Sequence, residues 1–387
     1  MMRSLTISTL KKWFFWLLGI REKPSKKINK VGKVVVVIPA YNEVAHIQRT
    51  IQSLQTQTMP PDRILVVDDC SSDGTGEVAR KCGAEVVRTP HNSGTKSQAQ
   101  NYALQLIDPN EYPVLITVDA DTVLAPDALE KILPYLSDSQ VASACGFVVP
   151  QRIKTIWERA RFIEYLITIT IHKGAQNHCG APMVSSGCFS AFNTKLLKEF
   201  GGFPDRTMAE DMDLTWCFLR KGKKIVLAPE AVCYPLDPHS FKCLLAQTRR
   251  WRRAFLQNIT VHGRGLWEKK SLFFFVFGYL CEALLSPLYY MGLGFLVFRA
   301  ISSSTSALVL LPYCLLTFGL VTILAIVKGW QLKKPGLALT SIPCYFLLEF
   351  VYFYVFWESV WLEWIRKKRL KNWEKGHPKE VSDGVCT

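Results

Sequence analysis

The stretch Lys33–Glu43, which reads KVVVVIPAYNE, carries the clearest structural signal in the chain. Its five consecutive β-branched residues, Val34–Ile38, are typical of a parallel strand that is buried on both faces. Apolar residues then recur at helical spacing over 47–54. A buried strand that leads through a short polar loop into a helix is the repeating unit of α/β domains, so this stretch predicts an α/β fold.

The same alternation of strand and helix continues as far as residue 118. We expect strands at 64–67, 85–88 and 114–118, and helices that begin near Asp73 and at about residue 95. This order predicts a Rossmann-like, doubly wound half of a parallel sheet. This half of the sheet belongs to a soluble domain, which we expect to comprise residues 33–237.

Composition and charge exclude several classes of protein. With 387 residues, 49% of them hydrophobic, and a mean hydropathy of +0.12, the chain is too apolar to be disordered and too long for a small disulfide scaffold. Twelve cysteines lie singly without a Cys-x-x-Cys pair, which argues against zinc and favours reduced thiols. The net charge of +15 is concentrated in residues 1–33, 238–270 and 366–387, so it indicates a membrane surface and no nucleic-acid partner.

The last third of the chain contains three apolar blocks, at 272–298, 307–327 and 337–357. Each is close to the length of about 20 residues that a membrane-spanning helix needs, so we expect about three spans. Glu282 and Glu349 should then face protein or a polar cavity. The basic residues 366–369 conflict with this count, because three spans place them outside the cytoplasm. A re-entrant third block is the alternative.

The expected organisation has five parts. They are a basic N-terminal segment (1–32), a soluble α/β domain (33–237), a basic amphipathic interfacial segment (238–270), about three transmembrane helices (271–365) and a basic C-terminal tail (366–387). Within the first part, the apolar run Trp13–Ile20 is too short to span, so we expect it to lie as an anchor in the membrane surface.

Acidic residues follow three of the predicted strands, at the edge where open parallel sheets bind their ligands. The strand ends lead into Tyr41 and Glu43, into Asp68-Asp69 and into Asp119-Ala120-Asp121. Alternate residues of an extended segment project to the same side, so Asp119 and Asp121 can hold one divalent cation. Mg²⁺ prefers a few carboxylates together with phosphate oxygens, which indicates a nucleoside diphosphate ligand. For any single acid, a helix cap is the alternative.

Residues 74–79 read GTGEVA and also match the dinucleotide-binding pattern. However, five residues separate this glycine from the preceding strand, and the next strand ends at Arg88 without the acid that binds a ribose. We therefore expect no nicotinamide cofactor.

Two further motifs lie beyond the predicted parallel strands. Glu210-Asp211 stands just before a helical run, and Gln247-Thr248-Arg249-Arg250-Trp251 lies in the basic segment before the membrane. The second motif has an alternative interpretation as a membrane-surface helix whose arginines extend to the interface.

Taken in order, these residues resemble the membrane-embedded family 2 glycosyltransferases, which include hyaluronan, chitin, cellulose and poly-N-acetylglucosamine synthases. The resemblance rests on 39–43, Asp68-Asp69, Asp119-x-Asp121, Glu210-Asp211 and Gln247-x-x-Arg250-Trp251. It implies a nucleotide-diphospho-sugar transferase domain of the GT-A type, followed by C-terminal transmembrane helices.

The resemblance also implies roles for individual residues. The catalytic residues would be Asp211, as the general base, and its neighbour Glu210, and Asp121 and Asp119 would hold Mg²⁺ or Mn²⁺. Asp119 would also contact the donor's diphosphate. The other substrate-binding residues would be Tyr41, Glu43, Asp68, Asp69, Lys96, Gln247, Arg250 and Trp251.

The implied reaction is a single displacement with inversion, because the motifs supply one base and no second carboxylate nucleophile. It would move a sugar, N-acetylglucosamine as the first choice, from a UDP-sugar to a growing β-linked polysaccharide. Transfer of one sugar to a membrane lipid, as in ceramide glucosyltransferases, is the alternative, and a non-enzymatic membrane scaffold is the alternative outside enzymes. We expect a multi-pass protein in the lipid bilayer whose catalytic domain faces the cytoplasm.

Overall fold

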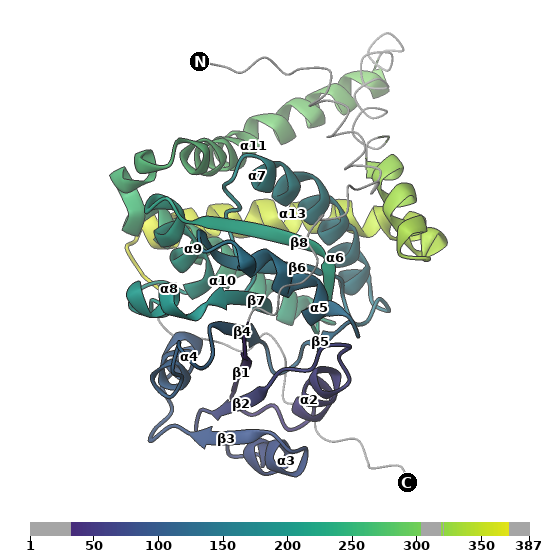
Figure 1. Cartoon of the computed structure of the whole chain (residues 1–387). Coiled ribbons are helices and arrows are strands. Elements are labelled where there is room, and N and C mark those ends of the chain that lie inside the picture. Colours follow the sequence, from purple (N-terminus) through teal and green to yellow (C-terminus); the bar gives the residue numbers. More distant parts are fainter. Residues whose placement is uncertain (1–31, 303–318, 320, 371–387) are drawn as a thin grey trace.

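A mixed sheet of eight strands forms the centre of the molecule (Figure 1). The computed structural model describes residues 32–302, 319 and 321–370. The strand order is β3-β2-β1-β4-β7-β6-β8-β5. The strands are β1 (Val34–Ala40), β2 (Arg63–Asp68), β3 (Glu85–Arg88), β4 (Val114–Val118), β5 (Val123–Leu124), β6 (Val141–Val148), β7 (Phe189–Asn193) and β8 (Lys224–Tyr234).

The first four strands in this order form the predicted parallel half. β1 pairs in parallel with β2 and β4, and β2 pairs in parallel with β3. The second half is mixed, because β7 runs antiparallel to β4 and β6, while β6 and β8 are parallel. The Rossmann-like half is therefore confirmed, and the complete sheet is the mixed sheet of a GT-A-like fold.

Helices cover both faces of this sheet. The helices and helical turns of the described residues are α2 (Ile47–Gln55), α3 (Thr75–Lys81), α4 (Lys96–Gln105), α5 (Ala128–Ile132), η1 (Leu133–Ser137), α6 (Ile156–Ile167), η2 (Thr168–Lys173), α7 (Gly174–His178), α8 (Thr194–Glu199), α9 (Glu210–Arg220), α10 (Phe241–His262), η3 (Gly263–Glu268), α11 (Lys270–Ser302), α13 (Pro335–Val360) and η4 (Trp361–Ile365). In β1, Val36 joins the core beneath α2 and α5, whereas Val35 joins the core beneath α4 and α9. Both faces of β1 are thus buried, as its β-branched sequence predicts.

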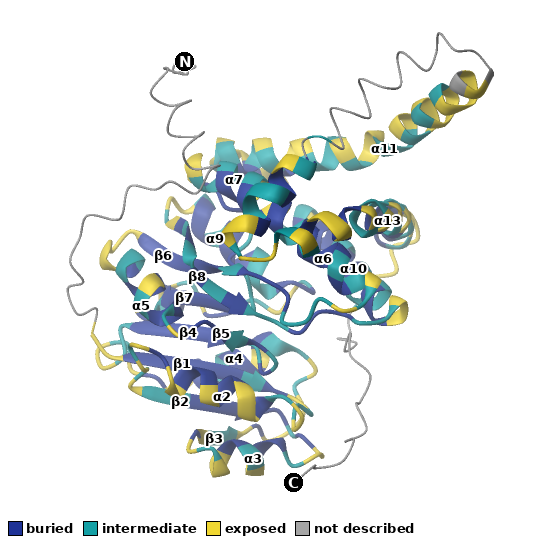
Figure 2. Cartoon of the chain, turned by 90° about the vertical axis from the view of Figure 1, so that its right-hand side faces the viewer, coloured by how far each residue is buried: buried dark blue, intermediate teal, exposed yellow. Residues whose placement is uncertain are grey.

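In the part of the chain that the structure describes, two helices are long and apolar enough to cross a membrane, over Lys270–Arg299 and Pro335–Ile365. They correspond to the first and third predicted spans. Figure 2 shows exposed residues along α11, whereas α13 lies beside α6 and α10. Most of the second predicted span, 307–327, lies outside the described residues, and its described end forms a shorter apolar helix over Val321–Gln331. The predicted anchor at Trp13–Ile20 and most of the tail also lie outside the described residues.

Ion pairs connect α10 to the C-terminal apolar helix. Both Nε and Nη2 of Arg249 donate to the Glu358 carboxylate, each at 2.6 Å. One turn further along, Arg253 Nε donates to Glu363 Oε1 at 2.6 Å. The basic segment predicted to lie at the membrane interface is therefore attached to α13, and its apolar face is part of the protein core.

The packing of α9 against α10 yields a stability prediction. The Trp216 side chain is 0% exposed, its Nε1 donates to the Met183 carbonyl at 2.9 Å, and its ring meets Phe255 edge-on. Trp216→Ala should lower the free energy of unfolding by about 3–5 kcal/mol, because the cavity stays unfilled. Leu106→Ala, at a side chain that is 47% exposed, is the control and should cost less than about 1 kcal/mol. Denaturant unfolding of the purified full-length protein measures both, and equal losses would contradict this packing.

Candidate active site

The carboxyl edge of the sheet opens into a cavity of about 1400 Å³. Its walls come from the loops after β1, β2 and β4, from the start of α9, and from α6, α10, α11 and α13. Eleven of the twelve predicted site residues line it: Tyr41, Glu43, Asp69, Lys96, Asp119, Asp121, Glu210, Asp211, Gln247, Arg250 and Trp251. Motifs that are far apart in the sequence therefore meet in one space.

Asp68 is the predicted site residue that does not line the cavity. Its side chain is 1% exposed, its Oδ2 lies 2.8 Å from Arg88 Nη1, and its Oδ1 accepts a hydrogen bond from the Ser71 backbone N–H. A Cβ at Gly76 would lie 2.8 Å from Asp68 Oδ2. The close approach to this carboxylate explains a glycine in the GTGEVA stretch without any dinucleotide. Asp68 therefore links β2 to β3 and to the loop that precedes α3.

The neighbouring Asp69 lines the cavity and organises the loop that leads to α4. Its Oδ1 accepts hydrogen bonds from the Thr89 hydroxyl at 2.8 Å and from the Ser93 backbone N–H at 3.0 Å. Its Oδ2 accepts one from the Ser93 hydroxyl at 2.8 Å. These bonds fix the loop that carries Lys96 at its far end, on the first residue of α4.

Lys96 lies between the acids of two motifs. Its Nζ forms an ion pair with Asp119, lies 3.6 Å from Glu210 Oε1, and donates to the Gly187 carbonyl at 2.9 Å. Burial favours the neutral amine, but the charges of Asp119 and Glu210 outweigh this effect and raise the pKa of Lys96 above its usual value. The ammonium therefore stays charged and neutralises part of the acidic cluster.

The predicted base, Asp211, lies in the first turn of α9, beside Glu210. Its Oδ2 accepts a hydrogen bond from the Gly187 backbone N–H at 2.9 Å, and its Oδ1 accepts one from the Met212 N–H at 2.8 Å. The N-terminal end of a helix favours negative charge. Burial raises the pKa of Glu210, although Lys96 opposes this shift. The two acids thus lie side by side at the start of α9.

Asp121 lies where negative charge accumulates. Burial raises its pKa well above the ordinary value, and the nearby carboxylates of Asp119 and Glu43 raise it further. Carboxylate oxygens that repel one another in this way fit a divalent cation, because the cation supplies the missing positive charge. Asp121 and Asp119 are therefore residues that fit Mg²⁺ or Mn²⁺.

A second group of potential metal ligands, Asp213, Cys217 and His262, lies on α9 and α10. Arg206 donates to both oxygens of Asp213, at 2.8 and 2.7 Å. Arg220 donates to Nδ1 of His262 at 3.1 Å, so the other ring nitrogen carries the proton and donates to Asp213 at 2.9 Å. Since hydrogen-bond donors occupy this carboxylate, the group is an ion-pair network that joins α9 to α10.

Arg161 on α6 holds the aromatic residue of the last motif. Its guanidinium lies over the Trp251 ring, 4.5 Å from the centroid, and over the Tyr165 ring at 4.4 Å. It also donates to Asp237 Oδ1 at 3.2 Å and to the Tyr352 hydroxyl of α13 at 2.7 Å. The position of Trp251 therefore depends on a buried arginine that belongs to none of the predicted motifs.

Several cavity residues are absent from the sequence-based prediction, among them Arg161, Glu164, Tyr165, Lys173 and Asp237. Most of them lie on α6 and η2, where charged residues alternate with large apolar ones. The signal that points to α6 is a basic side chain on a helix face that is otherwise apolar, because such a side chain needs buried partners.

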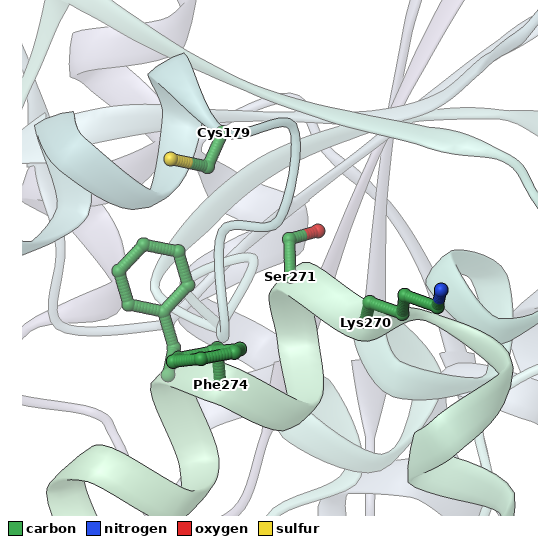
Figure 3. A pocket seen from close by; sticks show the side chains of 5 residues that line it. Cys179, Lys270, Ser271 and Phe274 are labelled. Atoms are coloured by element: carbon green, nitrogen blue, oxygen red, sulfur yellow. The ribbon is translucent and has the colours of Figure 1, made fainter. Parts of the chain in front are cut away.

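Figure 3 shows a smaller hollow of about 490 Å³ beside the start of α11. It is lined by Cys179, Lys270, Ser271, Phe274 and Phe275. Its described lining contains no carboxylate and no predicted site residue, so these residues provide no groups for the predicted chemistry.

Comparison with known proteins finds glycosyltransferases. Residues 35–201 match the family model described as "Glycosyl transferase family 2". The chain is 28% identical over 338 residues to the uncharacterized glycosyltransferase YaiP of Escherichia coli (strain K12), a match that covers 83% of this chain and 82% of that protein. It is 26% identical over 255 residues to the poly-β-1,6-N-acetyl-D-glucosamine synthase of Staphylococcus epidermidis. This second match covers 61% of each chain, less than two thirds of the synthase.

A similar fold is found in a solved structure, the mannosyltransferase PcManGT from Pyrobaculum calidifontis in complex with GDP-Man and Mn²⁺. The TM-score is 0.58, the sequence identity is 19%, and the match covers 87% of this chain and 94% of the other. The likeness supports the GT-A-like fold.

The network around Asp213 yields a pH-dependent prediction. Burial tends to raise the pKa of Asp213, but hydrogen bonds from Arg206 and His262 outweigh it and lower the pKa from 3.8 to about 2. A lowered pKa in the folded state stabilises the fold above the unfolded value of 3.8, and this contribution is lost as the pH falls toward 2. Asp213→Asn should therefore cost about 1–3 kcal/mol near neutral pH, and progressively less in acid.

Urea unfolding of the wild type and the variant at several pH values measures this difference. Asp127→Asn is the control, because the ion pair of Asp127 with Lys131 is 40% exposed on both sides and should contribute less than about 1 kcal/mol. A difference for Asp213→Asn that stays constant with pH would contradict the ionised network.

Proposed function

We propose that this chain, a glycosyltransferase with a family 2 domain over residues 35–201, transfers N-acetylglucosamine from UDP to the end of a growing β-linked polysaccharide. The observation that carries the proposal is the meeting of Asp119, Asp121 and Asp211 in one cavity that Trp251 also lines. The choice of sugar is supported by the similarity to a poly-β-1,6-N-acetyl-D-glucosamine synthase.

In the proposed reaction Asp211 is the general base. Its two hydrogen bonds from backbone N–H groups fix the orientation of the carboxylate toward the cavity. The acceptor hydroxyl gives its proton to Asp211 while its oxygen attacks the anomeric carbon of the donor. The bond from that carbon to the UDP oxygen breaks at the same time. One displacement inverts the configuration, so an α-linked donor gives a β-linked product.

The departing UDP needs positive charge near its diphosphate. Mg²⁺ or Mn²⁺ held by Asp121 and Asp119 would supply this charge when bound. Arg250 lines the same cavity and would add a fixed charge, as preorganised donors do for a developing anion. Tyr41, Glu43 and Asp69 would surround the uracil and the ribose, and Lys96 would keep the acids at their positions.

The acceptor would bind at the side of the cavity formed by α10. Trp251 offers an aromatic face for a sugar ring, and Gln247 on the preceding turn offers amide hydrogen-bonding groups. The Arg161 guanidinium on one face of the Trp251 ring leaves the tryptophan little freedom to turn away. This arrangement supports a role for the motif in placing the acceptor.

Transfer of one sugar to a membrane lipid is a second candidate reaction. It is favoured by the far end of the cavity, where Leu293 of α11 and Phe350 and Phe353 of α13 form apolar walls. In both reactions, two candidate spans and a UDP-sugar donor suit a membrane protein whose catalytic domain faces the cytoplasm.

Radioactive UDP-N-acetylglucosamine tests the proposed function directly. Membranes that contain the protein and a divalent cation should convert the label into large, solvent-insoluble material that a β-glycosidase digests. Asp211→Asn should reduce transfer by about 10²-fold or more, because the attacking hydroxyl keeps its proton, while UDP binding stays within a few-fold. Label in the organic extract would favour the lipid acceptor. Near-normal turnover of Asp211→Asn would remove Asp211 as the base.

The proposed metal ligand gives a separate prediction. Asp121→Ala should weaken UDP binding by about tenfold or more when Mn²⁺ is present, because the cation that links carboxylate and diphosphate is lost. In EDTA the variant and the wild type should bind UDP equally. Titration calorimetry on the purified protein measures the UDP affinity of the wild type and of the variant, each in Mn²⁺ and in EDTA. The same loss in EDTA as in Mn²⁺ would exclude a metal-dependent role for Asp121.

A further inference from the structure

Lys173 is a buried cation in the cavity that the proposed reaction does not yet use. It is the last residue of η2, it is 8% exposed, and it lines the cavity. Its Nζ donates one hydrogen bond, to the Ser186 hydroxyl at 2.8 Å. Among the described residues, no carboxylate forms an ion pair with it.

Burying such an ammonium costs free energy unless a group of opposite charge pairs with it. Taking an ion out of water costs several kcal/mol, and a bond to a neutral hydroxyl compensates only a part of this. An ammonium also has three hydrogen-bond donors, of which Lys173 uses one within the described part of the chain. Lys96, the other lysine in the cavity, differs because Asp119 and Glu210 surround it. The environment of Lys173 therefore suits an anionic ligand.

The position of Lys173 connects it to the reacting groups. Its partner Ser186 is followed by Gly187, whose N–H binds the proposed base, Asp211. The residue after Gly187 is Cys188, whose carbonyl accepts a hydrogen bond from the Asp119 N–H at 3.2 Å. One short loop thus joins Lys173 to the base and to the first acid of the Asp-x-Asp motif.

The local backbone supports a functional position. Lys173 ends a π-helical turn, Thr168–Lys173, inserted between the α-helices α6 and α7. π-helical turns are rare and occur often at functional sites, because the extra residue changes the direction of the side chains that follow. Thr168, Ile169, His172 and Lys173 of this turn all line the cavity.

The charged residues that line the cavity bear on which class of anion Lys173 would bind. Among the described residues, ten carboxylates line it, against five lysines and arginines. A diphosphate that enters this space meets net repulsion unless a metal ion and cations without ion-pair partners offset it. We propose that the Lys173 ammonium binds a phosphate oxygen of the donor's diphosphate, as an anion subsite beside the metal site. This inference rests on the proposed nucleotide-sugar donor, and the loop's contact with Asp119 favours the diphosphate over an anion of the acceptor.

The test measures binding of UDP and of inorganic pyrophosphate to the full-length protein by titration calorimetry, with Mn²⁺ and with EDTA. Lys173→Met keeps the apolar stem and removes the charge, so the dissociation constants of both ligands should rise by about tenfold or more in both buffers. Lys173→Arg should restore most of the affinity. Lys131→Met on α5, whose ammonium pairs with Asp127 at the surface, is the matched control and should change neither constant.

Unchanged affinities in folded Lys173→Met would overturn the proposal. A raised KM for the acceptor with unchanged affinity for UDP would assign the anion to the acceptor and overturn it as well. If Lys173→Met does not fold, the dissociation constants of UDP and pyrophosphate are measured for Lys173→Gln, which keeps a polar side chain, and they test the proposal in the same way. Pyrophosphate carries no nucleoside and no sugar, so its binding still tests Lys173 if the wild type fails to use UDP-N-acetylglucosamine.

Discussion

The ammonium of Lys96 is the interaction on which the candidate active site depends. It joins Asp119, which follows β4, to Glu210, which begins α9, and to the Gly187 carbonyl at 2.9 Å. Partly buried carboxylates at these positions repel one another, and without a cation between them the segments would separate or the acids would take up protons. Since the acids raise the pKa of Lys96, the lysine keeps its charge. It therefore sets the distance between the proposed base and the proposed metal ligands.

Local sequence signals were enough to predict the parallel half of the sheet, because buried β-branched runs and helical spacing are properties of short segments. Open parallel sheets bind their ligands at the carboxyl ends of the strands, and this rule then located most of the site. It does not separate Asp68 from Asp69, although neighbouring residues at a strand end point in opposite directions. Arg161 and Lys173 escaped prediction for another reason. Their surroundings form only on folding, as the contact of Arg161 with Tyr352 of α13 shows.

The apolar helix α13 takes part in building the site. Arg249 and Arg253 of α10 are held by Glu358 and Glu363 of the C-terminal helix, and Gln257 also donates to Glu363 at 3.1 Å. A partly buried pair of this kind is weak evidence for stability but fixes geometry, because breaking it leaves a charge uncompensated. The helix that carries the Gln-x-x-Arg-Trp motif thus has its position set by a candidate membrane span. A basic, amphipathic sequence alone indicates a surface helix and does not reveal this attachment.

The continuity of the cavity bears on the nature of the acceptor. From the acids at the sheet edge the cavity extends to Glu282 of α11 and to Tyr345 and Glu349 of α13. A carboxylate beside an acyl chain is unfavourable, since the chain offers no hydrogen bonds, whereas the hydroxyl groups of a sugar chain can donate to it. The apolar walls at Phe350 and Phe353, which suit an acyl chain, also allow a sugar chain, because sugar rings stack on aromatic faces. Carboxylates inside apolar helices are therefore an argument for the proposed polysaccharide acceptor over a lipid.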